Sequence, residues 1–435
     1  MANDTSNSGK AGLTRRTVLK GAAAVAGAAV GSGVITGFPT IWAQNIKDIV
    51  IRQMGSSGDT NKALEDAANA DLPFRVQVTA LDPSSVVARG ISQTDTWDVL
   101  SDGTADLPLF WPAKSFQPIE KKRLNWWGDV SPIFTSGRAT PEAKYGQGAN
   151  PFNVINADGP GIDSKMVAEE TEWLTGAPAL HNADTLGIRP DLVGREINSW
   201  ADLLSPEYKG RAAICAIPSV GMVDAAIALE AAGLVTYANK GNMTKEEIDA
   251  TIENLIRLKR EGHFRAFWSA YEESVNLMVG GETVIQSMWA PAVASVRAQG
   301  VPCVFQNLPE GYRCWAVALY INAKADGLLK DAIYEYLNWY HEAGKVGASF
   351  TLRGYYSAAP NTVRKVITPA QWDYFIEGKP ASEDILDANG NVIEKTGGLR
   401  TGGSYYERLS NPAVWNSIMD ENQYQIARWN EFLAT

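Results

Sequence analysis

The stretch DIVIRQMGSSGDTNKALEDAANADLPFRVQV, residues 48–78, decides the expected fold. Its apolar runs at 48–51 and 74–78 predict two β-strands, and the pattern at 60–70 between them predicts a helix. Strands that are joined through a helix usually pair in parallel. This stretch therefore indicates an α/β fold with a parallel sheet.

The same order continues beyond this stretch, with a helix expected at 83–89 and a strand at 97–100. In sheets of this kind, ligands bind beyond the carboxyl ends of the strands. We therefore expect a binding site near the loops 55–59 and 101–104, which follow two of these strands.

A second α/β unit is expected after an irregular region at 105–172 that is rich in Trp, Pro and Gly. Near the C-terminus, Asn389-Gly390 favours a hairpin turn. The other expected elements are strands at 212–216, 283–289 and 315–321 and helices at 220–232, 245–262 and 327–343.

The N-terminal segment 1–43 carries an export signature. Two adjacent arginines in Thr14-Arg15-Arg16-Thr17-Val18-Leu19-Lys20 precede a weakly apolar run at 21–35. This pattern is typical of a twin-arginine signal peptide, and the run is too short and too mildly apolar to anchor the chain in a membrane. We expect cleavage after Ala43 and a mature periplasmic protein that begins at Gln44, where no cysteine accepts a lipid.

The expected mature chain is strongly acidic. Without residues 1–43 it has 35 basic and 48 acidic residues, a net charge of −13. Nucleic acid and anionic membrane surfaces would repel such a chain, so neither is expected as a partner. Its length exceeds that of one compact core and suits two domains with a cleft between them. Some of its many tryptophans are expected to line a binding site.

The sequence leaves open whether two of the three cysteines form a disulfide. Cys303 and Cys314 flank a Pro-Glu-Gly turn at 309–311 that can bring two strands together, and an oxidising compartment permits a disulfide between them. The alternative is that both are free thiols. Cys215 lies in an apolar stretch and is expected to be a buried, unreactive thiol.

Motifs of common catalytic and metal sites are missing. The sequence contains only three histidines, His181, His263 and His341. So few histidines give little support for a histidine-dependent triad or a multi-histidine metal site. The sequence also has no phosphate-binding loop, HExxH or GxSxG motif. We expect no enzymatic activity, no cofactor and no metal. A secreted hydrolase with carboxylate catalysis is the alternative from another class, because its two acids can lie far apart in sequence.

The motif NSWADLL at 198–204 is followed directly by PEYKGR at 206–211. Supporting stretches are NADTLGI at 182–188, TWDV at 96–99, QGVP at 299–302 and GYYSAAPN at 354–361. Together these stretches resemble the extracellular solute-binding proteins that feed ABC importers, and most closely their spermidine/putrescine-binding branch.

The resemblance implies a type II periplasmic-binding-protein fold, in which two α/β lobes joined by hinge crossings close over a ligand in a central cleft. Lobe one would comprise residues 44–175 with 317–346, and lobe two 176–316 with 347–435. The resemblance also implies that a monomer delivers a small-molecule solute to an ABC permease of the inner membrane.

The resemblance implies some of the ligand contacts as well. Polyamine binders stack aromatic rings along the alkyl chain and hold its ammonium ends with carboxylates. Trp289, Trp315 and Tyr355 match three of the aromatic positions. The carboxylates do not match, because Val317 stands where the family has aspartate and residues 216–219 replace acids of the second lobe.

Two loops of small residues, 55–59 and 218–221, precede expected helices, and the first replaces an early aromatic pair of the family. Free N–H groups at a helix N-terminus attract anions. The alternative is that these residues only cap the helices. The candidate contacts in these loops are Ser57, Gly58, Asp59 and Ser219.

Three further side chains are candidates. Trp268 either lines the cleft or fills the core, and Asp102 follows a predicted strand and is placed to contact an amine. Arg353 pairs either with a ligand carboxylate or with a surface acid. We therefore expect a receptor for a small amine-containing solute, polyamine-like or zwitterionic. The alternative is a receptor for an organic anion such as a carboxylate or phosphonate.

Overall fold

The computed structural model describes residues 46–387 and 390–435. The expected signal peptide and Asn389 of the expected hairpin turn lie outside the described residues. Residues 45–435 cluster into one compact unit, so the boundaries of the two expected lobes stay a prediction. Within the described part of the chain, no helix is long and apolar enough to cross a membrane.

One large mixed sheet has the strand order β12-β11-β13-β10-β15-β3-β1-β2. At one end, β1 (Val50–Ser56) pairs in parallel with both β2 (Arg75–Leu81) and β3 (Val99–Gly103). The crossover helices are α3 (Lys62–Asp71) and α4 (Pro83–Ser92). This end has the order of strands and helices that the sequence predicts.

The other end of the sheet is built in the same way. There, β11 (Ala212–Cys215) pairs in parallel with β12 (Phe264–Trp268) and β13 (Ile285–Met288). The helices α8 (Pro218–Ala231) and α9 (Lys245–Arg260) lie between β11 and β12 in the chain. The α/β fold expected from the sequence is confirmed.

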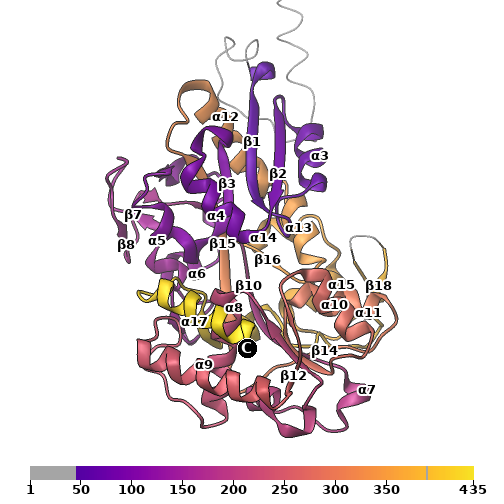
Figure 1. Cartoon of the computed structure of the whole chain (residues 1–435). Helices are drawn as coiled ribbons and strands as arrows, with labels where there is room; N and C mark the ends of the chain where they lie inside the picture. The colour runs from indigo at the N-terminus through magenta and orange to yellow at the C-terminus, as the bar shows by residue number, and fades with distance from the viewer. Residues whose placement is uncertain (1–45, 388–389) are drawn as a thin grey trace, which may run out of the picture. The chain divides into compact units, whose positions relative to one another are not determined.

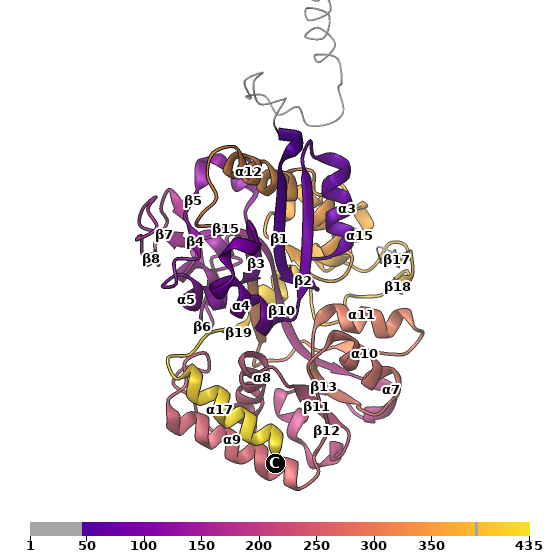
Figure 2. The same cartoon turned by 45° about the horizontal axis from the view of Figure 1, so that its top comes forward.

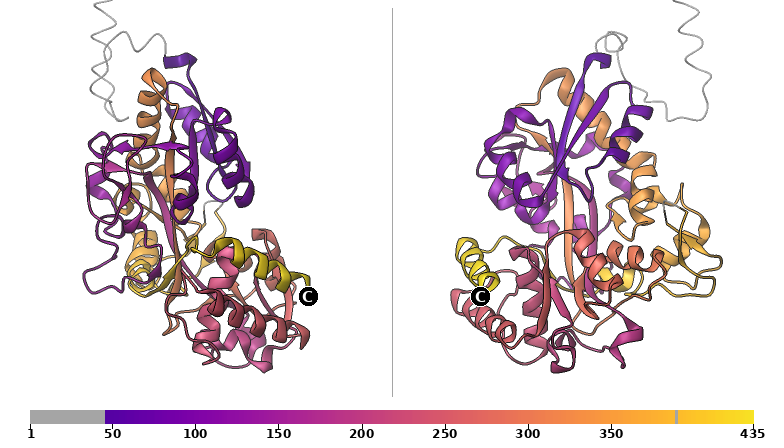
Figure 3. Two further views of the ribbon diagram at one scale, coloured as in Figure 1. Left: turned by 60° about the vertical axis from the view of Figure 1, so that its left-hand side comes forward. Right: turned by 45° about the vertical axis from the view of Figure 1, so that its right-hand side comes forward.

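Two long antiparallel strands, β10 (Ala177–Ile188) and β15 (Tyr312–Asn322), lie between these ends. Every residue of β10 is buried. Figure 1 and both views of Figure 3 show the two strands running from the β1–β3 end to the β11–β13 end. They are the strands on which the two ends of the sheet meet.

The register of β10 and β15 brings the carboxyl ends of the two parallel sets together. The last residue of β3, Gly103, pairs with Val317, and Met288 at the end of β13 pairs with Thr185. Thr185 follows Asp184, which pairs with Arg313. The two sets therefore end on the segment 312–317 of β15, about 17 Å apart along the strand at 3.3 Å per residue.

Two large apolar clusters flank this segment. One includes Leu100, Phe116 and Tyr320, and the other includes Trp200, Ile214 and Trp429. The C-terminal helix α17 (Asn422–Ala434) belongs to the second cluster and lies beside α9, as Figure 2 shows. Burial of these side chains removes apolar area from water and supplies the main stabilising free energy at each end.

The remaining elements are shorter or lie around the sheet. The helices are α5 (Leu107–Phe110), α6 (Ile133–Ser136), α7 (Pro190–Val193), α10 (Tyr271–Val279), α11 (Ala290–Ala298), α12 (Gly327–Glu342), α13 (Lys345–Thr351), α14 (Pro360–Val363), α15 (Pro369–Trp372) and α16 (Tyr405–Leu409). The strands are β4 (Phe116–Gln117), β5 (Ile119–Glu120), β6 (Gln147–Gly148), β7 (Asn156–Ala157), β8 (Met166–Val167), β9 (Trp173–Leu174), β14 (Val304–Phe305), β16 (Tyr356–Ser357), β17 (Ile385–Leu386), β18 (Val392–Glu394) and β19 (Pro412–Trp415).

The structure corrects several element boundaries. Strand β1 continues through Gly55 and Ser56, and β3 continues through Gly103, so the predicted loops are shorter than expected. The extra residues pair with neighbouring strands, which a local pattern does not reveal. At Gly55 a Cβ would lie 2.3 Å from Thr60 Oγ1, so the close approach requires glycine. Helix α8 begins at Pro218, which places Ser219 inside its first turn.

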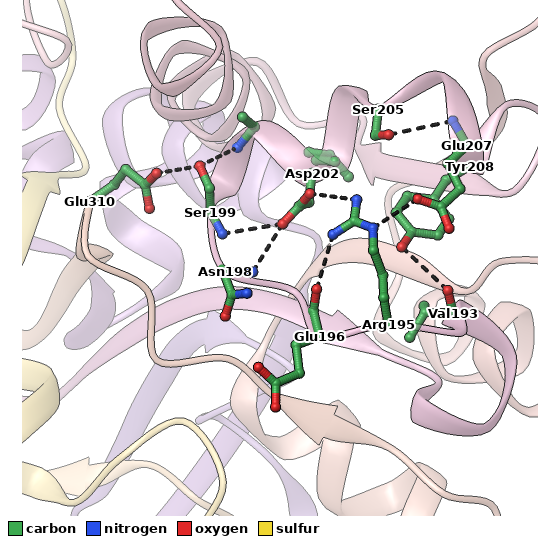
Figure 4. A network of polar contacts seen from close by, with 12 residues as sticks. Val193, Arg195, Glu196, Asn198, Ser199, Asp202, Ser205, Glu207, Tyr208 and Glu310 are labelled. Atoms are coloured by element: carbon green, nitrogen blue, oxygen red, sulfur yellow. Dashed lines mark hydrogen bonds and ion pairs between the residues drawn. The ribbon is translucent and has the colours of Figure 1, made fainter.

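The motif at 198–204 has a structural role in the fold (Figure 4). The Ser199 side chain accepts a hydrogen bond from the Ala201 amide, and Asp202 accepts bonds from the amides of Asn198 and Ser199. Arg195 donates to Asp202 Oδ1 at 2.7 Å and also pairs with Glu207. The Ser199 and Asp202 contacts cap the short 3₁₀-helix Trp200–Leu204, so the motif stabilises the local fold.

Candidate binding site

A buried ion cluster lies where the two ends of the sheet meet. Arg313 is 1% exposed; its Nε donates to Asp224 Oδ1 at 2.8 Å and its Nη2 to Asp184 Oδ2 at 3.1 Å. Burial raises the pKa of Asp184, and the positive charge of Arg313 opposes that rise. The cluster ties β15 to β10 and to α8, because the two acids belong to those elements.

Trp315 and Tyr355 form an aromatic pair beside this cluster. Their rings meet edge to face, with centroids 5.1 Å apart and an interplanar angle of 85°. Trp315 Nε1 donates to Asp184 Oδ2 at 2.7 Å, which fixes the orientation of the indole. The structure therefore brings together two of the three aromatic positions that the resemblance implies.

Trp268 and Trp289 form a second aromatic pair, at the ends of β12 and β13. Their centroids lie 4.9 Å apart at 90°. Trp268 is 1% exposed and packs with Cys215 and Val220, whereas Trp289 is only partly buried. Among the described residues, the Trp268 Nε1 hydrogen has no acceptor. Trp268 thus fills the core behind Trp289.

Asp59 is a buried carboxylate in the turn after β1. It accepts a hydrogen bond from the Ser56 hydroxyl at 2.8 Å and another from the Ser101 hydroxyl. Burial raises its pKa, and the bonds from Ser101 and Ser56 together with the charge of Arg353 oppose the rise. Ser101 pairs with Leu319, so Asp59 approaches the same face of β15 as Trp315, because alternate residues share a face.

Asp102 lies on the other face of β3. It pairs with Ala318, whose side chain lies on the opposite face of β15 from Trp315. The Oδ2 atom of Asp102 is buried and has no partner among the described residues. Burial raises its pKa strongly, and the neighbouring Asp106 adds to the rise. Burial likewise raises the pKa of Asp106 to about 6. The register therefore places Asp102 with Asp106 and not beside the Trp315 ring.

The helix-start residues differ in exposure. Ser57 is exposed and Gly58 half-buried, and helix α3 is capped by Asn61, whose side chain accepts from the Leu64 amide. Ser219 is half-buried in the first turn of α8, which has no side-chain cap at Ile217. Only the α8 terminus therefore matches the expected anion-binding arrangement of uncapped amides.

Arg353 lines a cavity of about 560 Å³. The half-buried guanidinium donates to the Gly58 carbonyl at 3.4 Å, and no carboxylate of the described residues forms an ion pair with it. None of the nine predicted contact residues lines this cavity. Its polar and charged lining residues include Asn61, Lys62, Tyr271, Ser295, Lys345 and Asp387.

Arg353 connects this cavity with the predicted residues. Its charge lowers the pKa of Asp59 and of Tyr355, each of which burial raises. Tyr271, on the far wall, donates its hydroxyl to the Pro291 carbonyl at 3.0 Å. The cavity wall thus offers one guanidinium without an ion pair and the rings of Tyr271 and Phe350, while Asp59 and Tyr355 lie outside the lining.

Sequence reasoning missed the ion cluster and the cavity. Arg313, Asp184 and Asp224 are single charged residues in apolar stretches, which is a weak signal that they are buried and paired. No sequence pattern marks Tyr271 as a cavity residue, because its position depends on how α10 packs against α11.

All three cysteines are free and buried, so the predicted alternative of free Cys303 and Cys314 holds in the structure. No group of three His, Cys, Asp or Glu side chains in the described residues is placed to hold a metal ion.

Comparison with solved structures shows how the fold is shared. A candidate spermidine/putrescine ABC transporter from Listeria monocytogenes is 12% identical, with 88% of this chain and 98% of that chain covered and a TM-score of 0.61. The Tp0655 (TpPotD) lipoprotein of Treponema pallidum is 11% identical, with coverages of 88% and 99% and a TM-score of 0.59. The Atu4243-GABA receptor is 16% identical, with coverages of 75% and 87% and a TM-score of 0.50.

The sequence itself matches a protein family over most of its length. No curated protein matches the chain. The model of the bacterial extracellular solute-binding proteins matches residues 62–374, which span both ends of the sheet and the strands between them. The chain therefore belongs to the bacterial extracellular solute-binding proteins.

Proposed function

We propose that this receptor captures a small zwitterionic solute that carries both an amine and a carboxylate. The proposal rests on Arg353, whose half-buried guanidinium lines the 560 Å³ cavity and forms no ion pair among the described residues. A guanidinium binds a carboxylate through two parallel hydrogen bonds. Arg353 is therefore the group that receives the solute carboxylate.

The amine of the solute lies toward the aromatic pair and Asp59. Ring faces attract ammonium groups, Trp315 and Tyr355 present such rings, and the charge of the buried Asp59 acts on Tyr355. Solved relatives are named for spermidine/putrescine and for GABA, which all contain amines. No step of catalysis is needed, since affinity arises from burial of the solute between rings and charges.

The screen that tests this proposal uses putrescine, γ-aminobutyrate and succinate, which have equally long carbon chains but different charges. A ligand that binds the folded state raises the melting temperature. We expect γ-aminobutyrate to give the largest rise, at a stoichiometry of one unchanged molecule per chain. Turnover of a bound solute, or stabilisation by putrescine alone, would contradict the proposal.

Arg353→Met isolates the carboxylate contact. Loss of a charged hydrogen bond should weaken zwitterion binding by about 1.5–3 kcal/mol, roughly ten- to hundredfold. Lys345→Met is the matched control, because Lys345 lines the same cavity but is paired with Asp71 at 3.0 Å. Equal effects of the two substitutions would mean that Arg353 is not the carboxylate contact.

A receptor for an organic anion is the second candidate. Lys62 and Lys345 line the same cavity as Arg353, and each would have to exchange its surface acid, Asp66 or Asp71, for a second anionic group of the ligand. In that case succinate would bind more tightly than γ-aminobutyrate, and Asp59→Asn would strengthen binding by removing a like charge.

Export and closure complete the proposal. Residues 1–43 direct the protein to the periplasm through the twin-arginine route, and a reporter fused to them should stay inside cells that lack that translocase. The lobes 44–175 with 317–346 and 176–316 with 347–435 close around the solute by bending at β10 and β15. Small-angle scattering should then show a smaller radius of gyration with solute than without it.

A further inference from the structure

A second, much smaller cavity lies near the C-terminal segment and is lined by three arginines. Its volume is about 40 Å³, and Arg297, Arg400 and Arg408 contribute to its wall. Much of the remaining wall is apolar, including Phe305, Phe375 and Ile393. This cavity shares one apolar lining residue, Ala294, with the cavity that holds Arg353, and no charged one.

Only one of the three arginines is neutralised by a local acid. Arg297 Nη2 forms an ion pair with Glu394 Oε1 at 2.7 Å, and the other Glu394 oxygen accepts from the Tyr374 hydroxyl at 3.1 Å. In the described part of the chain, neither Arg400 nor Arg408 forms an ion pair. Two positive charges at the cavity therefore lack a carboxylate.

Arg408 is fully buried with an unused donor. Its exposed fraction is 0%, its Nη2 donates to the Ala183 carbonyl, and its Nε has no acceptor among the described residues. The charge of Arg408 affects Asp184, but that carboxylate already accepts bonds from Arg313 and Trp315. A buried N–H without an acceptor is costly, so this donor needs a partner in the cavity.

Arg400 is bonded only to neutral acceptors. Its Nη1 donates to the Tyr356 hydroxyl and to the Phe375 carbonyl at 2.7 Å, and its Nη2 donates to the Gly354 carbonyl at 3.1 Å. Burial lowers the pKa of Arg400, and the charge of Arg408 lowers it further. A guanidinium nevertheless stays protonated in proteins, so the like charges persist at this cavity.

We propose that Arg400 and Arg408 bind a small monovalent anion of the halide class in this cavity. Such an ion would accept the free Nε hydrogen of Arg408 and offset the repulsion between the two guanidinium groups. The Thr401 hydroxyl, which accepts from the Phe305 amide at 3.3 Å and lines the cavity, is a third donor. A volume of about 40 Å³ exceeds the 10–15 Å³ that one water needs, but it excludes an amino acid or a polyamine.

Chloride titration of the mature protein without solute tests this site. Sodium chloride replaces sodium gluconate at constant ionic strength, so general screening does not change. We expect a saturable rise of the melting temperature by about 2 °C or more. Crystals soaked in bromide should show an anomalous peak between the two guanidinium groups. A flat titration or the absence of that peak would overturn the proposal.

Substitutions assign the ion to the two arginines. Arg400→Met should abolish the chloride-dependent rise, and Arg400→Lys should raise the half-saturating chloride concentration several-fold. Arg364→Met is the matched control, because the exposed Arg364 stacks at 5.0 Å over Trp372 and has no ion pair in the described part of the chain. An unchanged rise in both Arg400 variants would overturn the proposal, and the bromide peak tests it even if a variant fails to fold.

Discussion

The strand ends at the two ends of the sheet carry opposite chemistry. The ends of β1 and β3 lead to carboxylates, namely Asp59, Asp102 and Asp106, and burial raises the pKa of each. The ends of β12 and β13 lead to Trp268 and Trp289, which pack against each other. One end of the sheet thus offers buried negative charge and the other offers aromatic surface.

This difference gives the proposed zwitterionic solute two chemically distinct regions to contact. The carboxylates belong to the β1–β3 end, whereas Trp268 and Trp289 pack in a small cluster with Cys215 and Val220. Trp315 on β15 presents a ring on the face that Asp59 approaches, so the proposed site includes the connecting strand. The predictions below test what joins the two ends and what each contributes.

The largest expected effect is loss of the link between the ends. Arg313→Met leaves Asp184 and Asp224 buried without a cation and should destabilise the protein by about 3–5 kcal/mol, measured by urea unfolding. Arg428→Met is the control, because its partners Asp249 and Glu431 are solvent-exposed and the pairs are worth about 1 kcal/mol or less. Similar losses in both variants would show that the buried cluster does not join the ends.

The acidic end should make stability depend on pH. The folded pKa of Asp106 is about 6, above its ordinary value of 3.8, so the folded state holds the proton more tightly. The contribution of Asp106 to the free energy of unfolding is therefore fully present below pH 3.8 and is lost as the pH rises through 6. Asp106→Asn should remove that loss and raise stability at pH 7 by about 1–3 kcal/mol. Urea unfolding between pH 4 and 7 measures the slope, which Trp289→Phe at the aromatic end should leave unchanged.

The aromatic contribution should be smaller and specific to binding. Trp289→Ala and Trp315→Ala should each weaken binding of the solute found in the screen by about 1 kcal/mol or more, measured by calorimetry. Trp315→Phe keeps a ring but removes the bond to Asp184, so it separates ring contact from orientation. Trp173→Phe, in the small sheet formed by β5, β7, β8 and β9, is the control. Unchanged affinity in both alanine variants would mean that the rings do not contact the solute.

The smallest expected effect concerns the cysteines. Burial raises the pKa of Cys215 and Cys303 to about 12, and that of Cys314 is also raised. Thiol reagents should therefore react slowly with the folded protein and with three thiols after unfolding. Reductant should not change the melting temperature. A drop in melting temperature with reductant would indicate a disulfide between Cys303 and Cys314.

Local patterns predicted the alternation of strands and helices but not the strand ends. Apolar runs identified β1 and β3, while pairing with their neighbours extended them by several residues. Strand β12 was not predicted, since its sequence Phe264–Trp268 has no clear period. Of the site, the resemblance supplied the aromatic positions, and the structure pairs Trp315 with Tyr355.

The sequence by itself determined the α/β order and the solute-binding family, because both depend on residues close together in the chain. The tertiary structure decided that Arg313 pairs with Asp184 and Asp224, which lie 129 and 89 residues away. It also decided which face of β3 carries Asp102 and that Arg353 forms no ion pair among the described residues. Such facts depend on strand register and on which segments meet, and no local pattern of residues encodes them.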